Sequence, residues 1–153
     1  MKVFTIGFKG RTAKNFFLTL KNAGVQKLID VRRRNSSQLA GYSKGEDLKF
    51  FLEKCFNISY EHIPEFAPSE RLLGEYQNLL GKKKFNDSAW AYYVGEFRKE
   101  VLSEQIVQRF HEAADDLHVV CLLCSEETAE RCHRRLLAEY LKEHLRDIKV
   151  EHL

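Results

Sequence analysis

The residues best suited to chemistry in this sequence are Cys124, Glu126 and His133, which lie close together in its C-terminal third. A cysteine thiolate is a strong nucleophile and a histidine titrates near neutral pH, so the two together are typical of covalent group transfer. Cys124 ends an apolar run just before an expected helix, where the pKa of a thiol is lowered, although Glu126 and Glu127 oppose this effect. We therefore predict that Cys124 is the nucleophile or proximal thiol, that His133 is its acid–base partner, and that Glu126 orients water or a substrate hydroxyl.

His133 has a second interpretation. A helix over residues 126–145 would place His133 in the middle of an apolar face that includes Leu137. The ring would then point towards the sheet, beneath the edge where Cys124 emerges. The same position suits a core histidine satisfied by one backbone carbonyl, so the sequence leaves a catalytic and a structural role open.

Cys121 and Cys124 have the spacing of a Cys-x-x-Cys motif, but they lie in a run that is expected to be a strand. In an extended chain the two thiols point to opposite faces and are roughly 10 Å apart, whereas a disulfide needs Cα atoms less than about 7 Å apart. The motif therefore indicates neither a redox pair nor a zinc knuckle. Cys121 and Cys55 are predicted to be small buried apolar residues.

A metal site at Cys124, Cys132 and His133 is not predicted from the sequence. Neighbouring residues on one helix diverge by about 100°, so Cys132 and His133 would not share one tetrahedral ion. Cys124, Glu126 and His133 form the remaining combination, which is the weaker interpretation. We therefore predict no metal ligands, and the sequence indicates no particular cofactor.

Three further segments carry groups that suit an anion or a substrate. Arg32 follows Asp30 at the end of an expected strand, where its guanidinium suits a phosphate or carboxylate and equally suits an ion pair with Asp30. Residues 7–12 lack the spacing of a Walker A loop, yet their backbone N–H groups and Arg11 could bind an anion at a helix start. His62 ends another expected strand just before a proline, where it suits a base or ligand as well as a rigid turn.

The pattern of apolar residues predicts strands that alternate with helices. Strands are predicted at residues 3–7, 27–32, 58–63, 117–124 and 149–153, of which 3–7 and 117–124 are apolar runs. Apolar residues at helical spacing predict helices at residues 12–23 and 47–55, several between 69 and 114, and one at 126–145. The run at 117–124 is typical of a central parallel strand covered on both faces. We therefore predict a three-layer, Rossmann-like α/β fold with a mostly parallel sheet of about five strands, whose carboxyl edge binds ligands.

The composition favours one globular domain over residues 1–153. Of the 153 residues, 44% are apolar, 8 are glycine and 2 are proline, which allows a substantial core and argues against linkers or disorder. No apolar run approaches the length of a membrane span, and the run at residues 3–6 is shorter than the core of a secretory signal. We therefore expect a soluble cytoplasmic protein without a membrane partner.

The charges are unevenly distributed, although the net charge is only +3. Residues 1–54 carry 12 Lys/Arg and 4 Asp/Glu, whereas residues 55–153 carry 13 Lys/Arg and 18 Asp/Glu. A basic N-terminal third favours an anionic partner. We therefore expect a hydrolase or group transferase that acts on a small anionic or phosphorylated substrate, such as a nucleotide. Two alternatives are a nucleic-acid-binding module that stacks bases on Tyr42, Tyr60 and Trp90, and a non-catalytic module that binds a partner protein.

Motifs along essentially the whole chain resemble the DUF488 family, a group of small proteins of unknown function. The matching stretches are TIGFKGRT (5–12), IDVRR (29–33), SQLAGYSK (37–44), ISYEHIPE (58–65), LLCSEETAERCHRRLLAEYL (122–141) and VEHL (150–153). The resemblance implies an α/β fold and supplies no reaction. It gathers as site candidates Arg11, Asp30, Arg32, Ser37, His62, Cys124, Glu126, Cys132, His133 and Arg134. Those assigned to binding the anion or substrate are Arg11, Arg32, Ser37, His62 and Arg134.

Overall fold

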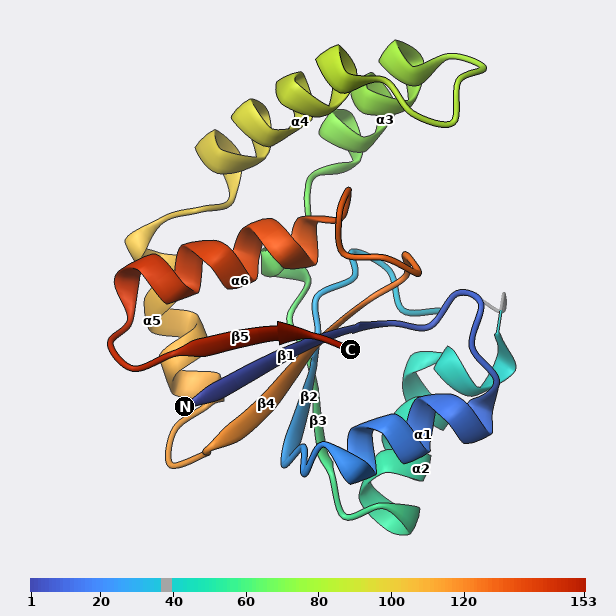
Figure 1. Ribbon diagram of the computed structural model, residues 1–153, viewed down its shortest axis with the longest axis vertical. Coiled ribbons are helices and arrows are strands. Elements are labelled where there is room, and N and C mark those ends of the chain that lie inside the picture. The colour runs from blue at the N-terminus through green and yellow to red at the C-terminus, as the bar shows by residue number, and fades with distance from the viewer. Residues whose placement is uncertain (37–39) are drawn as a thin grey trace.

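The structure, a computed structural model, describes residues 1–36 and 40–153 as a parallel sheet with helices on both faces (Figure 1). The strands are β1 (Lys2–Gly7), β2 (Lys27–Asp30), β3 (Ser59–His62), β4 (Val119–Cys124) and β5 (Lys149–His152). The helices are α1 (Ala13–Asn22), α2 (Gly45–Cys55), α3 (Glu70–Leu80), α4 (Asp87–Glu100), α5 (Glu104–Ala113) and α6 (His133–His144), with short 3₁₀ turns at Gly41–Ser43 and Pro64–Phe66. All paired strands are parallel, in the order β3-β2-β4-β1-β5. The predicted α/β fold and its central apolar strand, β4, are confirmed.

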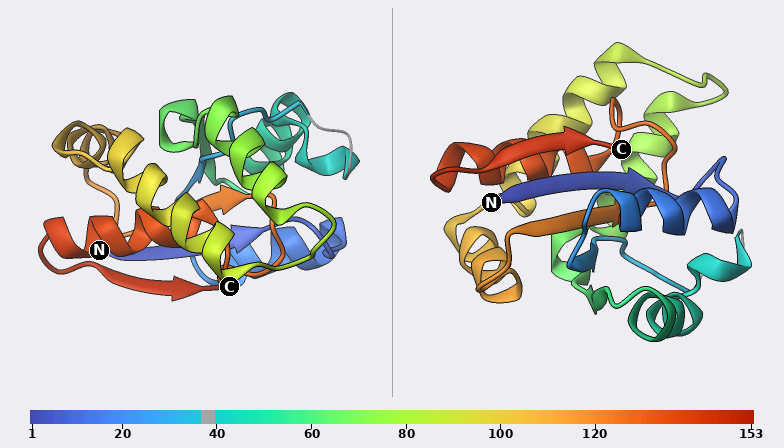
Figure 2. Two further views of the ribbon diagram at one scale, coloured as in Figure 1. Left: turned by 90° about the horizontal axis from the view of Figure 1, so that it is seen from above. Right: turned by 60° about the horizontal axis from the view of Figure 1, so that its bottom comes forward.

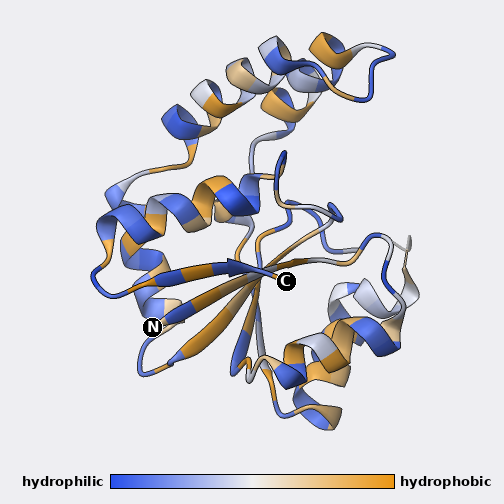
Figure 3. Cartoon of the chain, viewed as in Figure 1, coloured by the Kyte–Doolittle hydropathy of each residue, from blue (hydrophilic) through white to orange (hydrophobic). Residues whose placement is uncertain are grey.

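Side chains along each strand alternate between two apolar layers. On β4, Leu122 and Cys124 join the layer formed with α4, α5 and α6, whereas Cys121 and Leu123 join the layer formed with α1 and α2. The turned views in Figure 2 show α3 and α4 as an antiparallel pair on the side of α6. Figure 3 shows apolar residues concentrated in the strands and on the inward faces of the helices. The predicted placement of Cys121 and Cys124 on opposite faces is confirmed.

Local sequence sets several helix boundaries. The side chain of Thr12 accepts a hydrogen bond of 3.1 Å from the N–H of Asn15 at the start of α1, and Gly24, at φ 68°, follows its end. Ser103 lies at the N-cap of α5, in the short segment between α4 and α5. Within residues 1–36 and 40–153, no helix combines the length and apolar character that crossing a bilayer requires.

The predicted boundary of the last helix is wrong. Apolar spacing indicated a helix from residue 126, but α6 begins at His133, and residues 125–132 form a loop with turns. Arg134 holds this loop, because its guanidinium donates hydrogen bonds to the carbonyl oxygens of Glu126 and Glu127. These two carbonyl groups therefore accept hydrogen bonds from the Arg134 side chain and not from the backbone N–H groups of a helix.

The prediction that Cys55 is buried is also wrong. Cys55 is exposed, whereas Leu48 and Leu52 of the same helix are buried. Cys55 is the last residue of α2. It is therefore a useful reference thiol for measurements on the buried cysteines.

The strand order creates a topological switch point between β2 and β4. The chain leaves β2 through α2 to the edge strand β3, and it leaves β4 through α6 to the opposite edge strand β5. Because α2 and α6 cover opposite faces, the two connections diverge at the carboxyl ends of β2 and β4, which is the usual place for a ligand crevice in such folds. The residues that follow these strands, Arg32 and Cys124, are thereby brought to the same edge.

Glu61 ties the edge strand β3 to its neighbours. Its carboxylate lies 2.6 Å from Lys27 Nζ on β2 and also pairs with Arg109 on α5. Burial alone would raise the pKa of Glu61, but the hydrogen bonds and charges of Lys27 and Arg109 lower it overall.

We expect Glu61→Gln to be less stable than the wild type at neutral pH, by an amount that shrinks on acidification. A carboxylate with a lowered folded-state pKa stabilises the fold above its unfolded pKa and loses that contribution as the pH falls through its folded pKa. The difference in the free energy of unfolding should therefore close between about pH 5 and pH 3 in a series of urea titrations. Glu53→Gln, at an exposed position of α2, is the control. A difference for Glu61→Gln that stays constant with pH would contradict this account.

Candidate functional site

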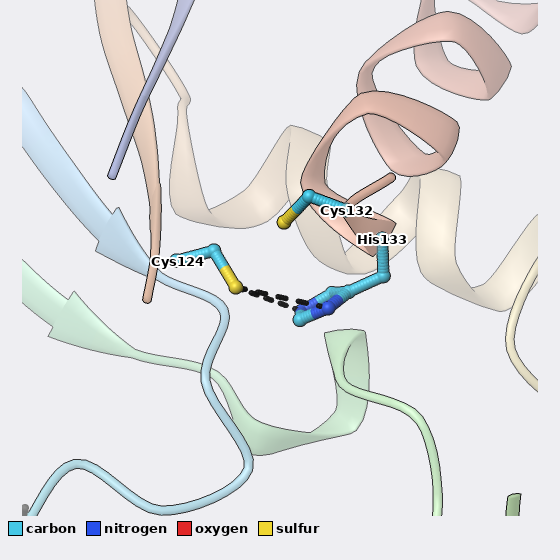
Figure 4. Close-up of side chains that lie close together, drawn as sticks. All are labelled: Cys124, Cys132 and His133. Atoms are coloured by element: carbon cyan, nitrogen blue, oxygen red, sulfur yellow. Dashed lines mark hydrogen bonds between the residues drawn. The ribbon is translucent and has the colours of Figure 1, made fainter. Parts of the chain in front are cut away.

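Cys124 and His133 lie against each other at the carboxyl edge of the sheet (Figure 4). Cys124 is the last residue of β4, and its Sγ atom is 3.8 Å from both Nδ1 and Nε2 of His133, the first residue of α6. His133 Nε2 donates a hydrogen bond of 2.8 Å to the carbonyl oxygen of Val31. Because a carbonyl only accepts, Nε2 carries a hydrogen, and Nδ1 remains for a second partner. The ring therefore has the backbone partner of a structural histidine and still offers Nδ1 to Cys124.

Cys132 belongs to the same cluster. It is the N-cap residue of α6 and has an extended backbone, with φ −132° and ψ 138°, so it does not follow the helical spacing that would separate it from His133. The Sγ atoms of Cys124 and Cys132 and a ring nitrogen of His133 all lie within 4.8 Å of one another. The expectation that Cys132 and His133 diverge is wrong for this reason. We call Cys124, Cys132 and His133 the thiol–imidazole cluster.

The members of the thiol–imidazole cluster shift one another's pKa values. A hydrogen bond from Cys132 and the adjacent ring of His133 hold the pKa of Cys124 well below its ordinary value, in spite of burial. Burial and the neighbouring Cys124 raise the pKa of Cys132 well above the ordinary value. Burial alone would lower the pKa of His133, but the charge and hydrogen bonding of Cys124 raise it overall. These contacts therefore favour the thiolate form of Cys124 and the protonated forms of Cys132 and His133.

Arg134 fixes the loop that covers this edge of the sheet. Its side chain is 1% exposed, and it donates to the carbonyl oxygens of Glu126 and Glu127 and, at 3.6 Å, to Cys132 Sγ. Gly7, at the end of β1, lies directly below, and a Cβ atom there would come within 1.6 Å of the Glu126 carbonyl oxygen. The close approach of this loop to β1 therefore requires glycine at position 7.

Arg32 forms the ion pair that the sequence left as one of two interpretations. Its Nε and Nη2 atoms donate to the two carboxylate oxygens of Asp30 at 2.7 and 2.6 Å, and Nη2 also donates to the carbonyl of Ser43. Tyr60 donates a hydrogen bond of 2.7 Å to the same carboxylate, and His62 Nε2 lies 2.7 Å from the carbonyl oxygen of Arg32. Among the described residues, Nη1 of Arg32 is buried without a hydrogen-bond partner. Nε and Nη2 of Arg32 are thus already hydrogen-bonded within the fold, and Nη1 is the one guanidinium nitrogen left to donate to a ligand.

A cavity of about 810 Å³ opens over the thiol–imidazole cluster. Its floor contains Cys124, Cys132 and His133, and the segments after β2 and β4 form two of its sides. The antiparallel pair α3 and α4 closes a further side with aromatic and aliphatic side chains. The charged residues that line it are Arg32, Arg33, Arg34, Glu70, Lys84, Glu126 and Arg131. Basic groups outnumber acidic groups around the cavity, which suits an anionic ligand.

The structure brings some of the predicted site residues to this cavity and places others elsewhere. Cys124, His133, Glu126 and Arg32 line it. The described lining does not include Arg11, His62 or Arg134. Arg11 donates to Asn15 of α1 at 3.0 Å, His62 contacts a backbone carbonyl, and the donors of Arg134 hold the loop after β4. Ser37 lies outside the described residues. Glu126 carries a carboxylate that pairs with Lys9 at 2.6 Å.

Of the aromatic side of the cavity, only Trp90 was predicted, as a candidate for stacking bases; Tyr76, Phe85 and Tyr93 were not. Trp90 stacks on Tyr93, with ring centroids 5.2 Å apart, and Tyr76 packs edge-on against Trp90. Phe85 and Arg131 are in contact across the rim, with the guanidinium 5.0 Å from the ring. The sequence shows these residues only as the apolar face of two helices and a connecting turn, because nothing in their spacing indicates where the pair α3 and α4 packs.

Both tyrosines proposed for base stacking, Tyr42 and Tyr60, form hydrogen bonds within the fold. Tyr60 donates to Asp30, and the hydroxyl of Tyr42 donates to the carbonyl oxygens of Phe8 and Arg11, at 3.3 and 3.0 Å. Of the three predicted stacking residues, Trp90 alone lines the cavity.

A family model described as a domain of unknown function, DUF488, matches residues 12–141, which is most of the chain. No curated protein and no solved structure matches the chain.

Proposed function

The chain belongs to the DUF488 family, and from its cavity we propose that the protein is a thiol-dependent hydrolase or group transferase for a small anionic substrate such as a nucleotide. The observation that carries the proposal is the contact of 3.8 Å between Cys124 and His133 on the floor of a cavity of about 810 Å³. A nucleophile beside an acid–base group is the minimal apparatus for covalent group transfer. Its position at the switch point of the sheet is the usual place for a ligand in this class of fold.

The lining of the cavity supports the substrate class. Arg33 and Lys84 can neutralise a phosphate, and Arg34 and Arg131 can do so by exchanging their partners Glu70 and Asp87 for it. The free Nη1 atom of Arg32 adds one donor near the cluster. The aromatic side formed by Tyr76 and Trp90 offers a surface for a planar ring. A nucleoside phosphate satisfies both requirements, with the base against the aromatic side and the phosphate against the arginines.

The proposed reaction begins with attack by Cys124. A lone pair of Sγ forms a bond to the electrophilic atom of the substrate, and the electron pair of the breaking bond leaves with the departing group. His133 donates a proton to that group. Water or an acceptor hydroxyl, oriented by Glu126, then attacks the covalent intermediate, its proton passes to His133, and Cys124 is released as a thiolate.

The proposal is tested by a thermal-shift screen of nucleoside phosphates, sugar phosphates and inorganic phosphate, followed by mass spectrometry of the products for each ligand that stabilises the protein. We expect Cys124→Ser to lower turnover by at least roughly 1000-fold, because a buried serine hydroxyl is a far weaker nucleophile than a thiolate. Cys121→Ser is the matched control, since Cys121 is equally buried on the same strand but faces the opposite layer. Turnover by Cys124→Ser at the wild-type rate, or the absence of any stabilising anion, would disprove the proposal.

A further inference from the structure

We propose that the thiol–imidazole cluster binds a thiophilic d¹⁰ metal ion, for which Zn²⁺ is the probe, with the fourth coordination position open to the cavity. The three ligands are Sγ of Cys124, Sγ of Cys132 and Nδ1 of His133. A site with three protein ligands and one open position is the pattern of zinc sites that exchange their fourth ligand.

The distances fit a tetrahedral ion. Zn–S bonds of about 2.3 Å and Zn–N bonds of about 2.0–2.1 Å place neighbouring ligand atoms about 3.5–3.8 Å apart. Cys124 Sγ lies 3.8 Å from each ring nitrogen of His133, and a ring nitrogen and the two Sγ atoms lie within 4.8 Å of one another. Small side-chain rotations are therefore enough to complete the coordination.

Two hydrogen bonds hold the proposed ligands in place, as hydrogen bonds to the ligands do in metal sites. The hydrogen bond from His133 Nε2 to the Val31 carbonyl fixes the ring and leaves Nδ1 as the ligand atom. Arg134 donates to Cys132 Sγ, a contact that stabilises a coordinated thiolate.

The ligand set also selects the kind of metal. Two thiolates cancel the charge of a divalent ion, so a neutral centre forms at a buried position. The three residues offer sulfur and nitrogen and no oxygen, which favours Zn²⁺ and other thiophilic ions over Mg²⁺ or Ca²⁺.

Metal binding has a consequence for the proposed reaction. A Cys124 thiolate bound to Zn²⁺ is no longer available as a nucleophile, so the metal-loaded protein is inactive in thiol chemistry until the ion is removed. This consequence rests on the proposed function, whereas the binding itself does not.

The binding is tested by titrating Zn²⁺ into the reduced, metal-free full chain in competition with a chromophoric chelator, and by recording thiolate-to-metal charge transfer with Cd²⁺. We expect one equivalent to bind, and Cys132→Ser and His133→Ala to weaken binding by more than about 100-fold, because loss of even an outer-shell partner typically costs 10–100-fold. Cys121→Ser, buried on the opposite face, should bind as the wild type does. Equal affinity in Cys132→Ser and the wild type would overturn the proposal.

A measurement on the wild type alone covers the case in which a variant does not fold. Zn²⁺ should protect Cys124 and Cys132 from alkylation by iodoacetamide, mapped by mass spectrometry, while the exposed Cys55 remains reactive. Alkylation of Cys124 at the same rate with and without Zn²⁺ would also overturn the site.

The two proposals fail separately. Stoichiometric Zn²⁺ binding, together with no turnover of any substrate by the metal-free protein, would support the metal site and refute the thiol enzyme. Turnover that depends on Cys124 but is insensitive to Zn²⁺ would refute the metal site and support the enzyme.

Discussion

Replacing Asp30 with asparagine is expected to lower the free energy of unfolding by about 3–5 kcal/mol, because it leaves the Arg32 guanidinium buried without its counter-charge. Arg32 is 3% exposed and Asp30 is fully buried. The carboxylate accepts two side-chain hydrogen bonds from Arg32 and one from Tyr60, and the uncharged amide would match this set of donors poorly. A loss of this size is a large part of the stability of a typical domain. Urea denaturation followed by circular dichroism measures it directly.

A surface ion pair supplies the control for Asp30→Asn. Arg34 and Glu70 also form a salt bridge, but their side chains are 75% and 61% exposed. Solvent screening leaves many such pairs without a measurable contribution, so Glu70→Gln should unfold at the same urea concentration as the wild type. If both variants lost the same stability, the buried pair would have no special role in the fold.

Replacing Gly7 with alanine is expected to destabilise the protein by at least about 3 kcal/mol, the upper end of the usual cost of overpacking. The new Cβ atom would lie 1.6 Å from the Glu126 carbonyl oxygen, which is backbone and is itself held by Arg134. Relief of the clash requires the loop after β4 to move as a whole. Calorimetric unfolding should show the loss, and faster alkylation of Cys124 should report the displaced loop.

Gly95 is the matched control for Gly7. It lies within α4, and a Cβ atom there would meet nothing within 4 Å. Gly95→Ala should therefore raise the free energy of unfolding by roughly 0.5–1 kcal/mol, since alanine has the higher helix propensity. A Gly7→Ala protein as stable as Gly95→Ala would mean that the loop does not pass over β1 as described.

The sheet could be predicted because its signals are local. Strands β1 and β4 are short apolar runs, and the alternation of side chains on β4 separates Cys121 from Cys124 without knowledge of any other element. The convergence of Arg32 and Cys124 at one edge also follows from parallel strands alone. What local signals left open was the partner of Arg32, because phosphate and Asp30 suit a guanidinium equally well.

The start of α6 and the role of Cys132 could not be predicted in this way. The apolar spacing from His133 onwards shows which face of a helix is buried, but the polar residues before it fit a helix or a loop equally well. The loop results from contacts distant in sequence, namely the close approach to Gly7 and the hydrogen bonds of Arg134. A shift of the helix start by a few residues changed Cys132 from a residue that diverges from His133 to a neighbour of Cys124.

Trp90, which stacks on Tyr93 in the lining of the cavity, is the single tryptophan of the chain. Its intrinsic fluorescence therefore arises from one known place in the fold. A ring that stacked against it would quench the emission, whereas an ion held by the sulfur atoms on the floor would leave its environment less disturbed. The protein thus carries its own optical probe, which reports occupancy of the cavity without a label and without catalytic turnover.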